Sequence, residues 1–183
     1  MRYAFFSALI GIGCEQQLPG DPVGSYQVSA TLEANSCGAA AVPAMDAFSF
    51  GVEIRRRDRE AFWLRDDTPM VSGVFTGDDQ YRFAFDATVE LVASDLDLGI
   101  AGCVLAQHEV LRVTAMEAPM EGATPMDDEE TMAAQTVPLH GEHSIDFAPL
   151  AGSDCAPALA ISGGPFAALP CSVIYALEGE AVE

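Results

Sequence analysis

The sequence predicts an all-β fold, an antiparallel meander of about eight strands that closes into a barrel or packs as a β-sandwich. Three observations predict it. Apolar and polar residues alternate with a period of two over long stretches, which places one face of each strand in a core and the other in water. No stretch shows the 3.6-residue period of an amphipathic helix. Short turn-forming segments separate the alternating runs, and short links join antiparallel neighbours.

The predicted strands follow one another along most of the chain. The clearest alternation covers residues 26–32, 48–55 and 81–91, and weaker strand patterns cover 61–65, 70–76, 103–115, 144–147 and 171–178. Turn residues at 56–59, 66–69 and 77–79 predict tight connections. Segments 117–135 and 148–170 are longer connections, and the first predicts a mobile acidic loop. Chain length and this single series of strands indicate one β domain over residues 24–183.

The beginning of the chain carries an export pattern. Arg2 precedes an almost wholly apolar stretch over residues 3–12, which is too short to cross a bilayer and is typical of a secretory signal. The sequence Gly11-Ile12-Gly13-Cys14 resembles the lipobox of bacterial lipoproteins, whose cysteine is lipidated and becomes the new N-terminus.

This resemblance implies a signal peptide over residues 1–13, a lipid on Cys14 and a lipidated tether over residues 14–23. The protein would then be anchored in the bacterial cell envelope, with the outer membrane favoured and the membrane as its partner. Glycines at positions 11 and 13 also suit ordinary signal peptidase, which leaves Cys14 unmodified. That alternative implies a soluble periplasmic or secreted protein.

The chain has five cysteines, an odd number that a lipid on Cys14 would explain. The disulfide candidates are then Cys37, Cys103, Cys155 and Cys171. Connections in a meander alternate between its two ends, and all four fall at the end away from the tether, so any of three pairings fits. Closing the loop of about 15 residues between Cys155 and Cys171 contributes roughly 3 kcal/mol, which favours that pair and leaves Cys37–Cys103. Buried free thiols are the alternative.

The same alternation places a cluster of arginines beside the tether. The cluster consists of Arg55, Arg56, Arg57 and Arg59. One hypothesis is that this hairpin faces the membrane and contacts anionic headgroups, where each Arg contributes about 1 kcal/mol. The alternative is a solvated turn neutralised by the many carboxylates of the chain.

Gly24-Ser25-Tyr26, at the start of the first strand, is similar to the G-x-W opening of lipocalin and wider calycin barrels. The resemblance implies a calycin-like barrel and specifies no ligand. We predict a packed interior, because the inward positions carry Tyr26, Phe48, Phe50, Phe62, Tyr81, Phe83, Phe85 and Tyr175. Trp63 is predicted to lie on the opposite, outer face.

Candidate metal ligands are few. The acidic run Asp127-Asp128-Glu129-Glu130 either binds a divalent cation or is a solvated charge run, since it lacks the spacing of an EF-hand loop. His140 and His143 have no third ligand at motif spacing and are better explained as loop histidines. We predict no metal site and no cofactor.

Composition excludes nucleic-acid binding, because 8 Lys+Arg against 28 Asp+Glu give a net charge of −20. Nucleophile elbows, C-x-x-C pairs and glycine-rich phosphate loops are absent from the sequence, so we predict no enzyme activity. The predicted function is a membrane-anchored envelope lipoprotein with a non-catalytic structural or interaction role, which includes a protein partner. The alternatives are a lipocalin-like carrier of a small apolar ligand and a divalent-cation-dependent binder or enzyme.

Overall fold

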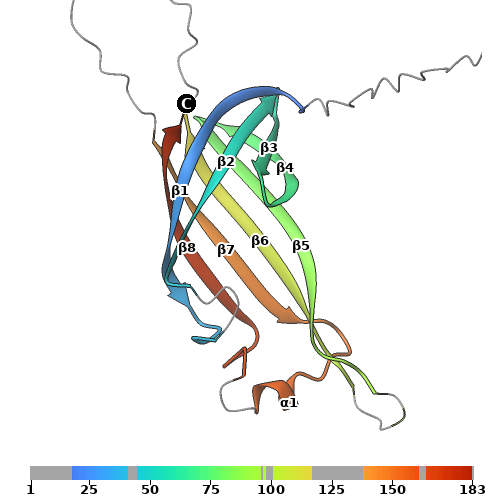
Figure 1. Cartoon of the computed structure of the whole chain (residues 1–183). Coiled ribbons are helices and arrows are strands. Elements are labelled where there is room, and N and C mark those ends of the chain that lie inside the picture. The colour runs from blue at the N-terminus through green and yellow to red at the C-terminus, as the bar shows by residue number, and fades with distance from the viewer. Residues whose placement is uncertain are drawn as a thin grey trace, which may run out of the picture.

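The computed structural model describes residues 18–40, 45–95, 97, 101–116, 138–160 and 164–182. Eight antiparallel strands close into a barrel in chain order, each paired with the next and the last with the first (Figure 1). The strands are β1 (Asp21–Asn35), β2 (Ala47–Arg57), β3 (Glu60–Arg65), β4 (Thr68–Gly77), β5 (Gln80–Val92), β6 (Cys103–Ala115), β7 (Leu139–Pro149) and β8 (Cys171–Val182). One short helix, α1 (Ala156–Leu159), precedes β8. The predicted all-β meander is confirmed, and it closes as a barrel.

The signal peptide, Cys14 and the acidic segment 117–135 lie outside the described residues. β1 begins at Asp21, within the range assigned to the tether. No helix in the described part of the chain has the length and apolar character needed to span a membrane.

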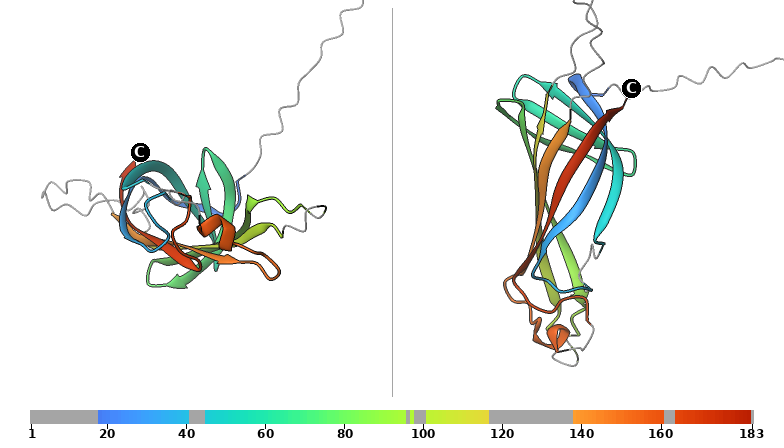
Figure 2. Two further views of the ribbon diagram at one scale, coloured as in Figure 1. Left: turned by 90° about the horizontal axis from the view of Figure 1, so that it is seen from below. Right: turned by 90° about the vertical axis from the view of Figure 1, so that its left-hand side faces the viewer.

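The barrel has two distinct ends (Figure 2). The near end holds the start of β1, the β2–β3 and β4–β5 turns and the end of β8, whereas α1 lies at the far end. Asp58, Asp78 and Asp79 occupy the near-end turns with φ values of 56°, 50° and 57°. Aspartate tolerates this left-handed backbone because its short side chain bonds the local backbone.

Aromatic side chains fill the near end of the barrel. The rings of Phe75 and Tyr81 lie 5.2 Å apart, and the Arg56 guanidinium covers Phe75 at 4.6 Å. Tyr26 is 2% exposed, and its hydroxyl donates to the Met116 carbonyl over 3.2 Å. Burial, followed by the nearby Tyr81 and Asp79, raises the pKa of Tyr26 to about 12. Gly24 is required beside this ring, because a Cβ there would lie 2.6 Å from the Tyr26 hydroxyl.

Two disulfides close the far end, as Cys37–Cys171 and Cys103–Cys155. The favoured pairing Cys155–Cys171 is therefore wrong. Strand adjacency decides the pairing, because β1 lies beside β8 and brings Cys37 next to Cys171. The second bridge joins the start of β6 to Cys155, at the N-terminus of α1. Disulfides are compatible with an exported protein.

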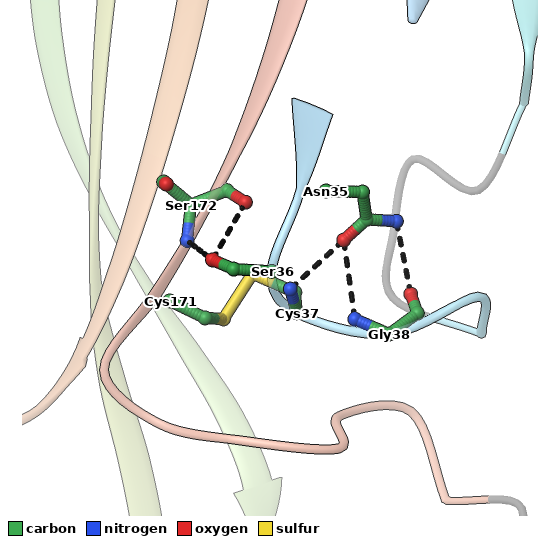
Figure 3. Close-up of a disulfide and its surroundings, with 6 residues drawn as sticks. All are labelled: Asn35, Ser36, Cys37, Gly38, Cys171 and Ser172. Atoms are coloured by element: carbon green, nitrogen blue, oxygen red, sulfur yellow. Dashed lines mark hydrogen bonds between the residues drawn. A yellow bond between two sulfur atoms is a disulfide. The ribbon is translucent and has the colours of Figure 1, made fainter. Parts of the chain in front are cut away.

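The backbone around the Cys37–Cys171 bridge is fixed by side chains (Figure 3). The Asn35 Oδ1 atom accepts from the backbone N–H groups of Cys37 and Gly38 at 2.8 and 3.1 Å. The Ser36 hydroxyl accepts from the Ser172 N–H at 2.8 Å and donates to the Ser172 carbonyl at 3.1 Å. These bonds hold the end of β1 against the start of β8, where the disulfide links them.

One side of the barrel wall is much shorter than the others. β3 has 6 residues and β4 has 10, whereas β5 and β6 have 13 each. β3 pairs with β2 only at residues 53–57, and β4 pairs with β5 only at residues 80–83. Within the described residues, no strand fills the space between the far halves of β2 and β5, and Figure 1 shows the β3–β4 hairpin ending above it.

The faces predicted for β3 are reversed. Trp63 is 3% exposed and points into the barrel, with its ring 5.4 Å from that of Phe83. Phe62 lies outside the core cluster and is covered by the Arg57 guanidinium at 5.8 Å. The register on β2 sets these faces, because Trp63 opposes the inward Ile54. β3 carries apolar side chains on both faces, so its alternation alone did not distinguish inside from outside.

Candidate functional site: a cavity in the barrel wall

A cavity of about 670 Å³ opens where the short β3–β4 hairpin ends. Its lining comes from six consecutive strands, β2 to β7, and includes Phe50, Trp63, Arg65, Phe85, Glu109 and His143. Sites for small molecules commonly have volumes of about 300–1,000 Å³ and a mostly apolar lining with a few convergent polar groups. The cavity has that size and that mixture.

Aromatic rings form the apolar part of the lining. Phe50 meets Trp63 edge-on at a centroid distance of 6.2 Å, and Phe85 and Leu111 face them from β5 and β6. Gly73 of β4 permits the packing behind Trp63, because a Cβ there would collide with the Arg82 carbonyl and the Phe83 ring. These rings are held in place by strands, which gives the cavity a preformed wall.

A buried acidic residue lies among these rings. Glu109 is 8% exposed, and one of its carboxylate oxygens accepts from His143 Nε2 at 2.8 Å. The other carboxylate oxygen accepts from Gln107 Nε2. Burying a carboxylate is costly unless hydrogen bonds or an opposite charge compensate it, and Gln107 and His143 supply two such hydrogen bonds to Glu109.

Tyr175 lies behind His143, with ring centroids 6.4 Å apart. Burial, with a contribution from the charge of Asp46, raises the pKa of Tyr175 above its ordinary value. The Tyr175 hydroxyl therefore stays protonated at physiological pH, and Glu109 and His143 are the hydrogen-bonded polar groups in the cavity lining.

Arg65 stands at the mouth of the cavity. Its guanidinium lies 4.3 Å from the centroid of the Phe50 ring and pairs with Asp67 at 2.9 Å. The hydrogen bond from Arg65 holds the pKa of the exposed Asp67 below its ordinary value. The positive charge at the mouth is therefore already matched by a carboxylate.

The prediction of a packed interior is wrong in this half of the barrel. Tyr26, Tyr81 and Phe83 do fill the near half, where the wall is complete. Phe50 and Phe85 instead face a hollow, because the short β3 and β4 place no further side chains between the far halves of β2 and β5.

The interpretation of His140 and His143 as loop histidines is wrong, because both belong to β7, and they do not act together. His143 points into the cavity, whereas His140 is exposed on the outer face, as a three-residue separation on a strand requires. His108 also lies outside and meets Asp86 at 2.7 Å. The described residues contain no group of three or more His, Cys, Asp or Glu side chains able to hold a metal, and the acidic run 127–130 lies outside them.

The arginine cluster lies beside the described start of the chain. Arg55 Nε donates to the carbonyls of Pro19 and Gly20 at 3.0 and 3.1 Å, and Arg55 also pairs with Glu53 at 2.5 Å. Arg57 pairs with Glu60 at 2.6 Å. These contacts place the cluster at the near end and use much of its charge within the molecule. Membrane contact through it stays a hypothesis.

Sequence reasoning missed Glu109, although a signal exists. The inward positions of β6 are the odd-numbered residues 103–115, and all are apolar except Gln107 and Glu109. Two polar residues in an otherwise apolar inward series mark a polar patch inside the barrel. That pattern indicates a polar site on the inward face of β6, and Glu109, one of its two residues, lines the cavity.

The contact between Glu109 and His143 could not be found in the same way. β6 and β7 are joined through segment 117–137, which is too long to fix the register between the two strands.

Comparison with known proteins found nothing similar: no family model, no curated protein and no solved structure matches this chain.

Proposed function

We propose that this chain is a binding protein that holds a small, largely apolar molecule in the side cavity of its barrel. The observation that carries the proposal is the 670 Å³ cavity, whose aromatic wall surrounds the buried Glu109–His143 pair. A barrel with a purely structural role gains stability by filling such a space, since apolar burial contributes about 25 cal/mol per Å². An aromatic cavity that the chain's own side chains leave open, with a buried carboxyl group in its lining, is better explained as a binding site for a ligand.

The cavity favours the carrier function over a purely structural role. We also propose that the protein is exported and anchored through Cys14, at the near end of the barrel. Two disulfides support export. Intact mass of the membrane fraction tests the anchor: acyl mass on a chain that begins at Cys14 supports it, and an unmodified soluble chain contradicts it.

Trp63 makes binding directly measurable, because it is the only tryptophan of the chain and lies in the cavity wall. We expect a neutral apolar fluorophore such as N-phenyl-1-naphthylamine to bind and to be excited by energy transfer from Trp63. Native mass spectrometry of protein purified from its own host should also find a retained ligand mass.

A pair of variants on β4 locates the binding. Val71→Phe places a larger side chain at the cavity and should weaken probe binding several-fold, whereas Val74→Phe changes a side chain that is 47% exposed and should leave it unaltered. Absence of probe binding to the unaltered protein, or equal effects of the two variants, contradicts the proposed function.

A further inference from the structure

We propose that the ligand is a cation, an apolar molecule with a protonated amine that pairs with Glu109 inside the cavity. This inference rests on the proposed binding function and names the chemical class of the ligand. Three observations carry it: the buried, hydrogen-bonded carboxyl group of Glu109, the position of the Arg65 guanidinium over the Phe50 ring, and the net charge of the chain.

Glu109 has acceptor capacity to spare. An ionised carboxylate offers about four lone-pair sites, and its two described donors are Gln107 and His143. A ligand ammonium would add a third donor and a full opposite charge. In a site shielded from water, such a charge-assisted bond is about twice as strong as a neutral one. The cost of burying Glu109 is then offset in the complex by the ligand.

One ring of the aromatic wall already lies against a cation. The Arg65 guanidinium lies over Phe50 at 4.3 Å, within the roughly 6 Å over which a cation is attracted to a ring face. An ammonium group beside Glu109 would lie in the same lining as Phe50, Trp63 and Phe85. The site therefore combines a carboxylate with aromatic rings, a pairing that suits a cation better than an anion.

The charge of the whole chain acts in the same direction. A net charge of −20 attracts cations and repels anions, and this field raises the rate at which a cationic ligand arrives. Arg65 does not reverse the preference, because Asp67 neutralises it at the mouth.

The test compares three probes of equal length: octylammonium, 1-octanol and octanoate. We expect isothermal titration calorimetry at pH 7 and about 0.15 M salt, where long-range fields are screened, to show octylammonium binding about ten- to a hundredfold more tightly than octanol. Octanoate should bind most weakly. The inference is overturned if octanol binds as tightly as octylammonium, or if octanoate binds most tightly of the three. Either result leaves the proposed binding function of the cavity standing. Binding of none of the three overturns both.

Two variants assign the preference to one carboxylate. Glu109→Gln keeps the shape and removes the charge, so it should abolish the preference for octylammonium over octanol. Glu142→Gln makes the same charge change on the outer face, where Glu142 meets Arg112 at 3.4 Å, and should leave the preference intact. If both variants show the same preference for octylammonium over octanol, Glu109 is not the source of that preference. The probe series on the unaltered protein decides the ligand class even where Glu109→Gln does not fold.

Discussion

The near and far halves of this barrel are held together by different means. In the near half, all eight strands are paired, and aromatic rings such as Tyr26, Tyr81 and Phe75 fill the interior. In the far half, β2 and β5 have no described strand between them, a cavity opens beside this gap, and two disulfides fasten the far end, one between β1 and β8 and one between β6 and the N-terminus of α1. Neither disulfide crosses the gap between β2 and β5.

The difference shows how a small barrel maintains an opening in its wall. A missing wall section removes hydrogen bonds and apolar contacts from one side, which lowers stability. Disulfides restore stability without filling space, because they restrict the unfolded chain. The four predictions below test this division between the halves, from the largest expected effect to the smallest.

Removal of the disulfides should have the largest effect. By the chain-entropy model, Cys37→Ser with Cys171→Ser should lower the free energy of unfolding by about 5 kcal/mol, and Cys103→Ser with Cys155→Ser by about 4 kcal/mol, because their sequence separations are 134 and 52 residues. Urea unfolding under oxidising conditions measures both. Losses near zero for either pair would mean that the far half does not depend on its covalent bonds.

Leucine truncation should separate the packed near end from the lining of the cavity. Leu139→Ala, at a near-end side chain that is 0% exposed, should lower the free energy of unfolding by about 4 kcal/mol, because it leaves a closed void. Leu111→Ala enlarges an existing cavity and should cost only about 2 kcal/mol, the transfer contribution alone. Thermal and urea unfolding of the two variants give the comparison. Equal losses would contradict the difference in packing.

Two glycines test how tightly the wall itself is built. Gly73→Ala should lower the free energy of unfolding by about 3 kcal/mol, because its Cβ would meet the Arg82 carbonyl and the Phe83 ring. Gly51 has no atom within 4 Å of its ideal Cβ position and lies just beyond the residues of β2 that pair with β3. Gly51→Ala should therefore change stability by no more than about 0.5 kcal/mol. If Gly51→Ala lowers the free energy of unfolding more than Gly73→Ala does, the wall at Gly73 has room for an added methyl group.

Alkaline pH should act on the near half. The pKa of Tyr26 is raised from 10.0 to about 12, so its contribution is complete below pH 10 and is lost as the pH rises through 12. The unfolded chain releases this proton first, and the loss should amount to about 2 kcal/mol. Urea unfolding between pH 9 and 12 measures it. In Tyr26→Phe, the free energy of unfolding should depend less steeply on pH. If it falls with pH as steeply as in the unaltered protein, the loss comes from other groups.

Most of the fold could be predicted from the sequence, because alternation is a local signal. All eight strands correspond to predicted runs, and the turns at Asp58 and Asp78-Asp79 carry residues suited to their backbone. The inward face of β3 and the disulfide pairing could not be predicted in this way. Both depend on which residues oppose each other across a ladder, as Trp63 opposes Ile54 and Asn35 opposes Val173.

The candidate site was less predictable than the fold. Phe50 and Phe85 were predicted to point inward but Trp63 was not, and the number of inward aromatic residues suggested a filled barrel. The cavity exists because β3 is only six residues long, and a short strand pattern does not reveal what is missing beside it. Glu109 was detectable as a polar residue at an inward position, whereas its contact with His143 depends on register.

The short β3–β4 hairpin has one more consequence, for how copies of this chain behave together. In the described structure, the far halves of β2 and β5 each present one strand edge without a ladder partner. Such edges are templates for strand addition between molecules. β2 is uncharged from Ala47 to Val52, so its own side chains do not protect that edge. The net charge of −20 repels one copy from another. High salt weakens that repulsion, and we expect it to promote association through these edges.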